Sequence, residues 1–157
     1  MSEQNFSSRN KFEIIISREN TDNLKFFCKN ITIGGIGIGS ILQSNPIAQL
    51  PIVGDSYYIE DLAINFYIDE YWEVVLEILS WLKSLKNGAD MKQNYNDVAD
   101  ISIRIMNSKY RGNKILLYKD CFPISIASFD QDVEDDGMPL QVMTIFKSRD
   151  FEIIEES

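Results

Sequence analysis

The stretch of sequence that decides the fold is Asp61-Leu-Ala-Ile-Asn-Phe-Tyr-Ile-Asp-Glu-Tyr-Trp-Glu-Val-Val-Leu-Glu-Ile-Leu-Ser-Trp-Leu-Lys-Ser-Leu85. Its first half alternates apolar and other residues with the period of a β-strand, which places four apolar side chains on one face: Leu62, Ile64, Phe66 and Ile68. Its second half has apolar residues at the three- and four-residue spacing of an amphipathic helix: Tyr71, Val75, Ile78, Leu82 and Leu85. We therefore predict a half-buried strand that leads directly into a helix at about 70–86, with the carboxylate of Asp69 capping its first turn.

Composition indicates one domain with an acidic surface. The chain has 157 residues, of which 45% are hydrophobic, and this length and apolar content suit a single core spanning residues 1–157. Asp and Glu number 24 against 15 Lys and Arg, so the net charge of −9 disfavours general binding to nucleic acids. No apolar run is long enough to span a bilayer, and the polar start lacks the order of a secretion signal, so we expect no membrane and assembly in the cytoplasm.

The rest of the chain predicts further strands in antiparallel pairs. Residues 12–17 and 24–33 are expected to form an opening hairpin across a turn at 19–23. A second hairpin is predicted from the alternating isoleucines at 101–105 to residues 114–119, and a third pair from 122–129 and 140–147. The fold class expected is therefore mainly β, an antiparallel β-sandwich or small barrel with one flanking helix.

Two segments interrupt this pattern. Residues 34–56 hold five of the eight glycines and two of the four prolines, so we expect a long loop excursion that makes contacts. Residues 87–98 are mostly polar and without clear periodicity, so we expect a surface connection after the helix.

Residues that carry common chemistry are scarce. The absence of histidine removes the commonest general base and metal ligand, together with every Ser-His or Cys-His nucleophile arrangement, and we predict that the protein is not an enzyme. Cys28 and Cys121 lie among apolar neighbours, which favours two small buried side chains over a disulfide. We expect no cofactor and no metal.

Two apparent ligand motifs fail on spacing. The run Gly34-Gly-Ile-Gly-Ile-Gly39 lacks the third glycine of a dinucleotide fingerprint, because Ser40 occupies that place, and no helical pattern follows it. In the acidic loop, Asp132, Glu134 and Asp136 match a calcium loop, but Met143 stands where the bidentate glutamate belongs.

Apolar residues on both faces of several strands favour assembly as the function. Such strands need cover on both sides, and one helix cannot supply it for a sheet of six or seven strands. Two packed sheets or a neighbouring subunit must therefore provide the remaining cover. The segments concerned are Ile14 to Ile16, Phe26-Phe-Cys28 and Ile145-Phe146.

These residues resemble the tail-tube-fold proteins of contractile-tailed bacteriophages. The resemblance rests first on the block from Asp61 to Glu70 that leads into Trp72 and Ser80-Trp-Leu82. It continues in Phe27-Cys-Lys29, Ile33-Gly-Gly-Ile-Gly-Ile38, Phe122-Pro-Ile-Ser125, Thr144-Ile-Phe-Lys147 and Phe151-Glu-Ile153. It spans about residues 12–154, and the Gly34-Gly35 pair departs from the Pro-Gly that is frequent in the family.

The resemblance implies a structural protein of the virion tail, assembled in the host cytoplasm, whose strands join those of identical copies in a hexameric ring around a channel. The other tail proteins would be its partners, and DNA would be passing cargo, kept from sticking by an acidic lumen. The version of the strand-helix block here resembles most the tail completion or tube terminator branch. A repeated tube subunit, a baseplate tube initiator and, more distantly, a free-standing ligand-binding β-sandwich remain alternatives. The contact residues expected are Gly34, Gly35, Gly37, Gly39, Pro46, Pro51, Asp69, Glu70, Trp72 and Trp81.

Overall fold

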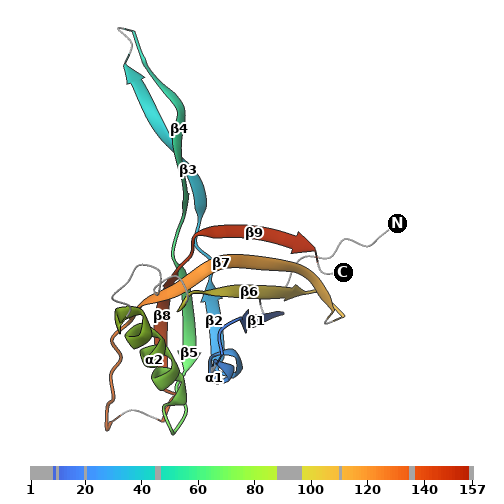
Figure 1. Cartoon of the computed structure of the whole chain (residues 1–157), viewed down its shortest axis with the longest axis vertical. Helices are drawn as coiled ribbons and strands as arrows, with labels where there is room; N and C mark the ends of the chain where they lie inside the picture. The colour runs from blue at the N-terminus through green and yellow to red at the C-terminus, as the bar shows by residue number, and fades with distance from the viewer. Residues whose placement is uncertain are drawn as a thin grey trace.

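The computed structural model describes residues 9, 11–19, 21–44, 47–87, 97–109, 111–134 and 137–155. Its elements are, in order, β1 (Phe12–Ile16), α1 (Asp22–Phe26), β2 (Cys28–Thr32), β3 (Ile36–Ser44), β4 (Gln49–Ile59), β5 (Leu62–Tyr67), α2 (Glu73–Asn87), β6 (Ala99–Met106), β7 (Gly112–Ile126), β8 (Gln141–Lys147) and β9 (Asp150–Glu155). Strands dominate and pair antiparallel throughout the described residues, which confirms the predicted mainly-β class (Figure 1).

Strand β7 belongs to two layers of one continuous sheet. Its first half pairs with β6 on one side and β9 on the other, and its second half pairs with β8. We call β1, β6, the first half of β7 and β9 the β9 layer, and the second half of β7, β8, β5 and β2 the β5 layer. The strands of the two layers run across each other in Figure 1.

The bend in β7 has a local cause. The register of β6 and β7 shifts between the pairs Ala99–Cys121 and Ile101–Tyr118, so β7 carries an extra residue at this point. Asp120 lies there with φ of 52°, in the left-handed region that Asp tolerates better than most residues. Its N–H is satisfied by the carboxylate of Asp100 at 3.1 Å. A bulge of this kind bends a strand and increases its twist, which turns the sheet from one layer into the other.

The hydrophobic core lies between the two layers and under α2. Leu62, Ile64 and Phe66 of β5 are buried as their alternation predicts. Their counterparts on the β9 layer include Ile101 and Tyr118. Trp81 closes the core from the helix side, with its ring centroid 5.7 Å from that of Phe146 on β8.

The strand and helix are joined by a link of five residues, which corrects the expectation that one feeds directly into the other. Residues 68–72 form this link, and Trp72 has φ of 58° immediately before α2 begins. The helix therefore starts later than predicted. Of the predicted apolar face, Ile78 is buried and Leu82 and Leu85 pack against the core, whereas Tyr71 is exposed. Val74 and Trp81 are also buried.

The predicted opening hairpin is wrong. Strand β1 pairs with β6, and β2 pairs with β5, so the first two strands belong to different layers. Residues 22–26, expected to form the end of the turn and the start of the second strand, form the short helix α1. A distant residue explains the difference, because the carboxylate of Glu77 on α2 accepts hydrogen bonds from Leu24 N at 3.3 Å and from Asn23 Nδ2 at 2.7 Å.

The later strands follow the predicted pairs. Strand β6 pairs with the first half of β7, and the second half of β7 pairs with β8. The sequence divides β7 into two strands, whereas the structure runs them together through the bend at Asp120.

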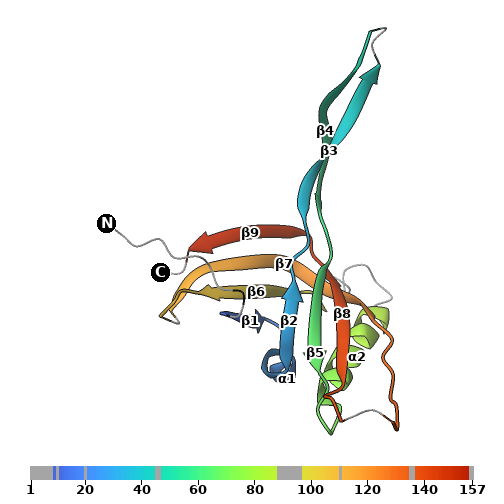
Figure 2. The same ribbon diagram turned by 180° about the vertical axis from the view of Figure 1, so that it is seen from behind.

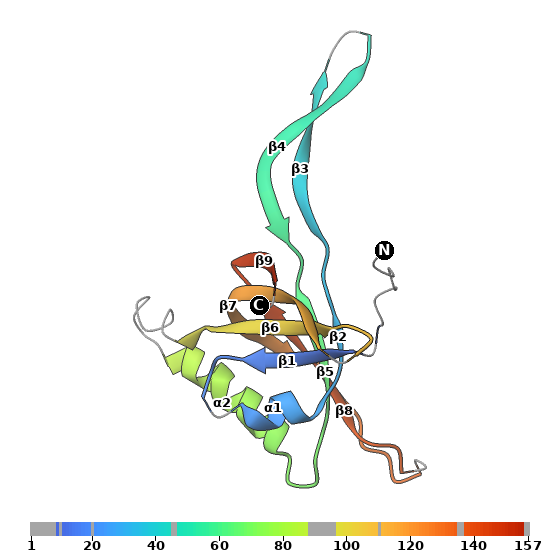
Figure 3. The same cartoon turned by 90° about the vertical axis from the view of Figure 1, so that its right-hand side faces the viewer.

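Residues 34–56 do not form a loop. Strands β3 and β4 pair as a two-stranded ribbon that stands away from the two layers, and we call β3 and β4 the arm (Figure 3). The correction has a physical reason, because the glycines and prolines are interleaved with isoleucine, leucine, valine and tyrosine, which favour extended backbone. Of the predicted connection at 87–98, residues 88–96 lie outside the described residues.

Both cysteines are free thiols, and Cys121 is buried in the core. Burial raises the pKa of the Cys121 thiol to about 12 and that of Cys28 to about 11. None of the helices in the described ranges has the length and apolar character needed to cross a membrane.

The cap on α2 predicts a stability effect. Asp69 Oδ1 accepts a hydrogen bond from Glu73 N at 2.8 Å, as the sequence predicts. We expect Asp69→Ala to lower the free energy of unfolding by about 1 kcal/mol, because it leaves this helical N–H without its side-chain acceptor. Thermal denaturation should show a melting temperature about 2–4 °C lower. Asp69→Asn keeps an acceptor and is the matched control, and equal melting of all three proteins would contradict the role.

A buried hydroxyl predicts the opposite effect. Thr144 on β8 is fully buried, and its Oγ1 has no hydrogen-bond partner among the described residues. We expect Thr144→Val to raise the free energy of unfolding by about 1 kcal/mol, because the desolvated hydroxyl is removed while the shape is kept. Chemical denaturation should show this, and Thr144→Ser, which keeps the hydroxyl and loses the methyl group, should destabilise. A destabilised valine variant would mean that the hydroxyl has a partner.

Candidate assembly surfaces

Several strand edges of the described fold have no neighbour. Strand β1 pairs only with β6, β2 only with β5, and β9 only with β7, and residues 122–126 of β7 pair only with β8. An unpaired edge presents a row of backbone donors and acceptors that can bind another strand. Each layer therefore ends in a free edge on both sides, which makes these edges candidate contacts between subunits.

The β9 edge combines free backbone groups with exposed apolar side chains. Ile153 is 61% exposed, and its neighbour Ile154 is also exposed. Ion pairs hold the strand against β7, with Lys119 Nζ 2.9 Å from Glu152 Oε1 and a second pair between Lys114 and Glu155. The strand is thus fixed in place on one side and unpaired on the other.

The β1 and β2 edges face a groove of about 580 Å³ that α1 borders. Phe26 of α1 lies at this groove with 81% of its surface exposed. Glu13 of β1 lies 3.1 Å from Lys25 Nζ and 3.4 Å from Arg104 Nη1. The hydrogen bond from Lys25, helped by Arg104, holds the pKa of the Glu13 carboxyl below its usual value. The groove therefore has an apolar rim at Phe26 and a charged wall in which Glu13 and Lys25 are paired.

The arm carries a long series of exposed apolar side chains. From Gly34 to Ile59 only Asp55 is charged. The exposed apolar side chains along it are Ile36, Ile38, Leu42, Ile47, Leu50, Ile52, Val53, Tyr57 and Tyr58. Contiguous apolar surface of this kind is typical of sites that bind another protein. A two-stranded ribbon has little stability alone, so its exposed side chains favour cover from a neighbouring molecule.

Two glycines allow the arm strands to approach closely. The register shifts between the pairs Ile38–Tyr57 and Ser40–Val53, and Gly39 and Gly54 meet at this irregularity. A Cβ placed on Gly54 would lie 2.5 Å from Gly39 O, which is backbone and cannot move aside. A Cβ on Gly39 would meet nothing closer than Ser56 O at 3.6 Å. Of these two glycines, only Gly54 is therefore sterically required.

The predicted contact residues separate into three places. Gly34, Gly35, Gly37, Gly39 and Pro51 lie at the base of the arm or in it, and Pro46 lies outside the described residues. Asp69, Glu70 and Trp72 lie in the link before α2. Trp81 is fully buried, so it belongs to the core and is removed from the predicted contact set.

The Trp81 indole is held by polar contacts as well as by packing. Its Nε1 donates to Asp97 O at 2.7 Å, and the guanidinium of Arg18 lies 5.1 Å from its ring centroid. Trp72 is partly exposed and packs on Phe129, with ring centroids 5.6 Å apart. Of the two tryptophans, only Trp72 is available for contact with another chain.

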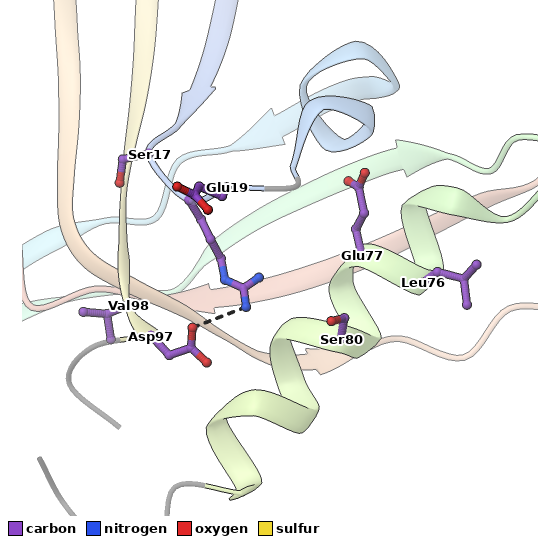
Figure 4. Close-up of a pocket in the computed structure, with 8 residues that line it drawn as sticks. Ser17, Glu19, Leu76, Glu77, Ser80, Asp97 and Val98 are labelled. Carbon is purple, nitrogen blue, oxygen red and sulfur yellow. Dashed lines mark hydrogen bonds and ion pairs between the residues drawn. The ribbon is translucent and has the colours of Figure 1, made fainter. Parts of the chain in front are cut away.

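A groove of about 650 Å³ lies between α2 and the chain after β1 (Figure 4). Arg18 Nη2 lies 3.3 Å from Asp97 Oδ1 across it, and Glu77 is held by its hydrogen bonds from α1. Among the described residues, no three side chains of Asp, Glu or Cys gather as a metal site. Within this groove Arg18 and Asp97 are therefore paired with each other, and Glu77 is bound to α1.

The sequence analysis did not identify two exposed apolar sites, one on α1 and one on β9. In the sequence, the consecutive apolar residues Phe26 and Phe27 indicate a strand with two apolar faces. In the structure, Phe26 is exposed on α1. Ile153 and Ile154 are adjacent in sequence and both exposed on β9, a signal of the same kind that could have identified this edge.

Solved structures with a similar fold come from contractile injection systems. A sheath/tube terminator of the PVC extracellular contractile injection system, in the extended state, has a TM-score of 0.74 at 12% identity over 98% of this chain and 99% of that chain. The tube-terminating cap of the anti-feeding prophage has a TM-score of 0.72 at 14% identity over 99% and 95%. A chain of the PVC sheath–tube complex in the extended state has a TM-score of 0.64 at 13% identity over 93% and 89%.

No protein-family model and no curated protein sequence matches this chain. Identities of 12–14% show a shared fold. The chain therefore has the fold of tube-terminator and tube proteins of contractile systems, which confirms at the level of fold the resemblance seen in the sequence.

The two arm glycines give a prediction with an internal control. We expect Gly54→Ala to distort the arm, because its Cβ would press on the Gly39 backbone, and Gly39→Ala to be accommodated. Limited proteolysis of the purified proteins should cleave residues 36–59 faster in Gly54→Ala than in Gly39→Ala, while both melt at similar temperatures. Equal cleavage of the two variants would show that the close approach does not shape the arm.

Proposed function

We propose that this protein is a structural subunit of a contractile tail or injection apparatus and forms a ring that terminates its tube. The observation that carries the proposal is the set of free strand edges together with a projecting apolar arm. A subunit with free edges on both sides of each layer is incomplete alone, and a closed ring of copies pairs those edges. The shared fold with a tube terminator and a tube-terminating cap supports this reading.

The terminator is favoured over the repeated tube subunit and the baseplate initiator. The terminator and the cap reach TM-scores of 0.74 and 0.72, whereas the chains from the sheath–tube complex and the baseplate both reach 0.64. A tube subunit must bind itself head to tail, whereas a terminator needs one face that accepts the tube and another that stops growth.

The ring is proposed to be hexameric, as the resemblance to tail-tube proteins implies. The baseplate structure with a similar fold is described as 6-fold symmetrised. Its partners would be further copies of this chain and the tube, sheath or neck proteins that adjoin it, in a tail assembled in the cytoplasm of a host cell.

The arm is proposed to reach the adjacent ring or subunit. It extends beyond both layers in each of the views (Figures 1 to 3), so its apolar side chains lie away from the protein's own core. Burial of its exposed isoleucines, leucines and tyrosines against a second ring would stabilise the stack at about 25 cal/mol per Å² of apolar surface.

Assembly of the purified protein tests the proposal. We expect size-exclusion chromatography with light scattering to give a hexamer, and negative-stain electron microscopy to show rings that do not grow into tubes. Long tubes would identify the repeated subunit instead, and a stable monomer at micromolar concentration would contradict both roles.

Removing the arm should separate ring formation from stacking. Glu60 N donates to Gly35 O at 2.9 Å, so a short glycine linker can replace residues 36–59 without separating the strands that lead into the arm. We expect this variant to form rings and to lose its binding to tube ends, measured by co-sedimentation with preformed tubes. Gly39→Ala serves as the full-length control, and undiminished co-sedimentation of the shortened protein would assign stacking to another surface.

A further inference from the structure

Charge is distributed unevenly between the two layers. The chain carries 24 acidic residues, yet none lies in β2, β5, β8 or residues 122–126 of β7, which together make up the β5 layer. The charged residues of these strands are Lys29 and Lys147. The β9 layer, in contrast, contains acidic residues in β1, β6, β7 and β9. A protein of net charge −9 thus has one layer without a carboxylate.

Both lysines lie on the face of the β5 layer that points away from the core. The buried residues of β8 are Val142, Thr144 and Phe146, so the alternation places Lys147 on the opposite face with Ile145. Lys29 Nζ donates to Gln141 Oε1 at 2.9 Å and lies 5.8 Å from the ring centroid of Tyr67.

The residues between the two lysines are neutral. The register pairs Tyr67 with Gln141, Asn65 with Met143 and Ala63 with Ile145 on the same outward face. Asn65 Nδ2 also donates to Gln141 Oε1, at 3.2 Å. Neither lysine has a carboxylate partner among the described residues.

This face is uncovered in the single chain. Figure 2 shows β2, β5 and β8 side by side with no helix in front of them, because both helices and the β9 layer lie behind. The layer ends in free edges at β2 and at residues 122–126 of β7, so it can continue into a copy on each side.

The direction of the strands determines how such a continuation would close. The chain passes from β2 into β3 and from β4 into β5 with short connections, and the arm extends roughly along the direction of β2 and β5 (Figure 1). A ring closed through the β5 layer would therefore have strands running along its axis and the arm projecting from one rim. The strands of the β9 layer run across this direction and do not suit such a closure.

We infer that the outward face of the β5 layer lines the channel of the ring and gives it a wall without carboxylates, with Lys29 and Lys147 repeated around it in two belts of positive charge. This inference rests on the proposed ring. Charged belts in a channel select by sign, so this wall favours solutes and cargo that carry negative charge. This wall would be positively charged, whereas the sequence analysis expects an acidic lumen.

The position of the face is tested by labelling in assembled rings. Met143 is exposed at the middle of the face. In a Cys28→Ser background, where Cys121 stays buried, Met143→Cys and Lys83→Cys each supply one accessible thiol for a maleimide gold cluster. Electron microscopy should show gold at the centre of rings for position 143 and elsewhere for position 83 on α2. Gold away from the centre for position 143 overturns the inference with the ring intact, whereas absence of rings in the parent protein refutes the proposed function.

The charge of the face is tested with small thiol reagents of opposite sign. We compare Met143→Cys with Val133→Cys, which is exposed between Asp132 and Glu134. The ratio of modification rates by an anionic and a cationic methanethiosulfonate should be about tenfold higher at position 143. The ratio cancels differences in thiol reactivity between the two sites.

Charge reversal supplies the matched control for this measurement. Lys29→Glu with Lys147→Glu should lower the ratio at position 143 several-fold, whereas Lys83→Glu with Lys86→Glu changes the net charge equally on α2 and should leave it nearly unchanged. An equal ratio at positions 143 and 133, or equal effects of the two double variants, overturns the assignment of a positive wall.

Discussion

The structure depends on the division of β7 between two layers. A single strand satisfies its hydrogen bonds with β6 and β9 along its first half and with β8 along its second half. The bulge at Asp120 turns the strand between them, and the Asp100 carboxylate fixes that turn through the Asp120 N–H. Without this turn, the layers would lie in one plane and the core between them, with Trp81 at its side, would not form.

Two layers that share a strand leave free edges at their other limits. Within one chain nothing described pairs with the outer sides of β1, β2 and β9. Backbone groups along such edges are satisfied by water in a free subunit and by neighbouring strands in an assembly. In the proposed ring, these edges would join identical copies, and the arm would add an apolar contact in a second direction.

Charge adds a further constraint, because the acidic residues are excluded from one layer. The charged residues of the β5 strands are two lysines, so this layer differs in sign from the rest of an acidic chain. In the proposed ring this difference would give the channel wall a positive potential, while the other surfaces keep the net negative charge of the chain.

The sequence by itself determined the strand from Leu62 to Tyr67, the helix after it, the Asp69 cap, the later strand pairs and the family whose fold the chain shares. These features depend on local periodicity and on caps within a few residues. The tertiary structure alone decided the rest. The helix α1 is bound by the carboxylate of Glu77, more than fifty residues away. The first two strands belong to different layers, and Trp81 rather than Val75 enters the core. The tertiary structure also decided that residues 34–56 form an arm and that one face lacks carboxylates. Which strands pair, and which side chains lie on the same face, depend on residues far apart in the chain. Local sequence patterns therefore do not predict them.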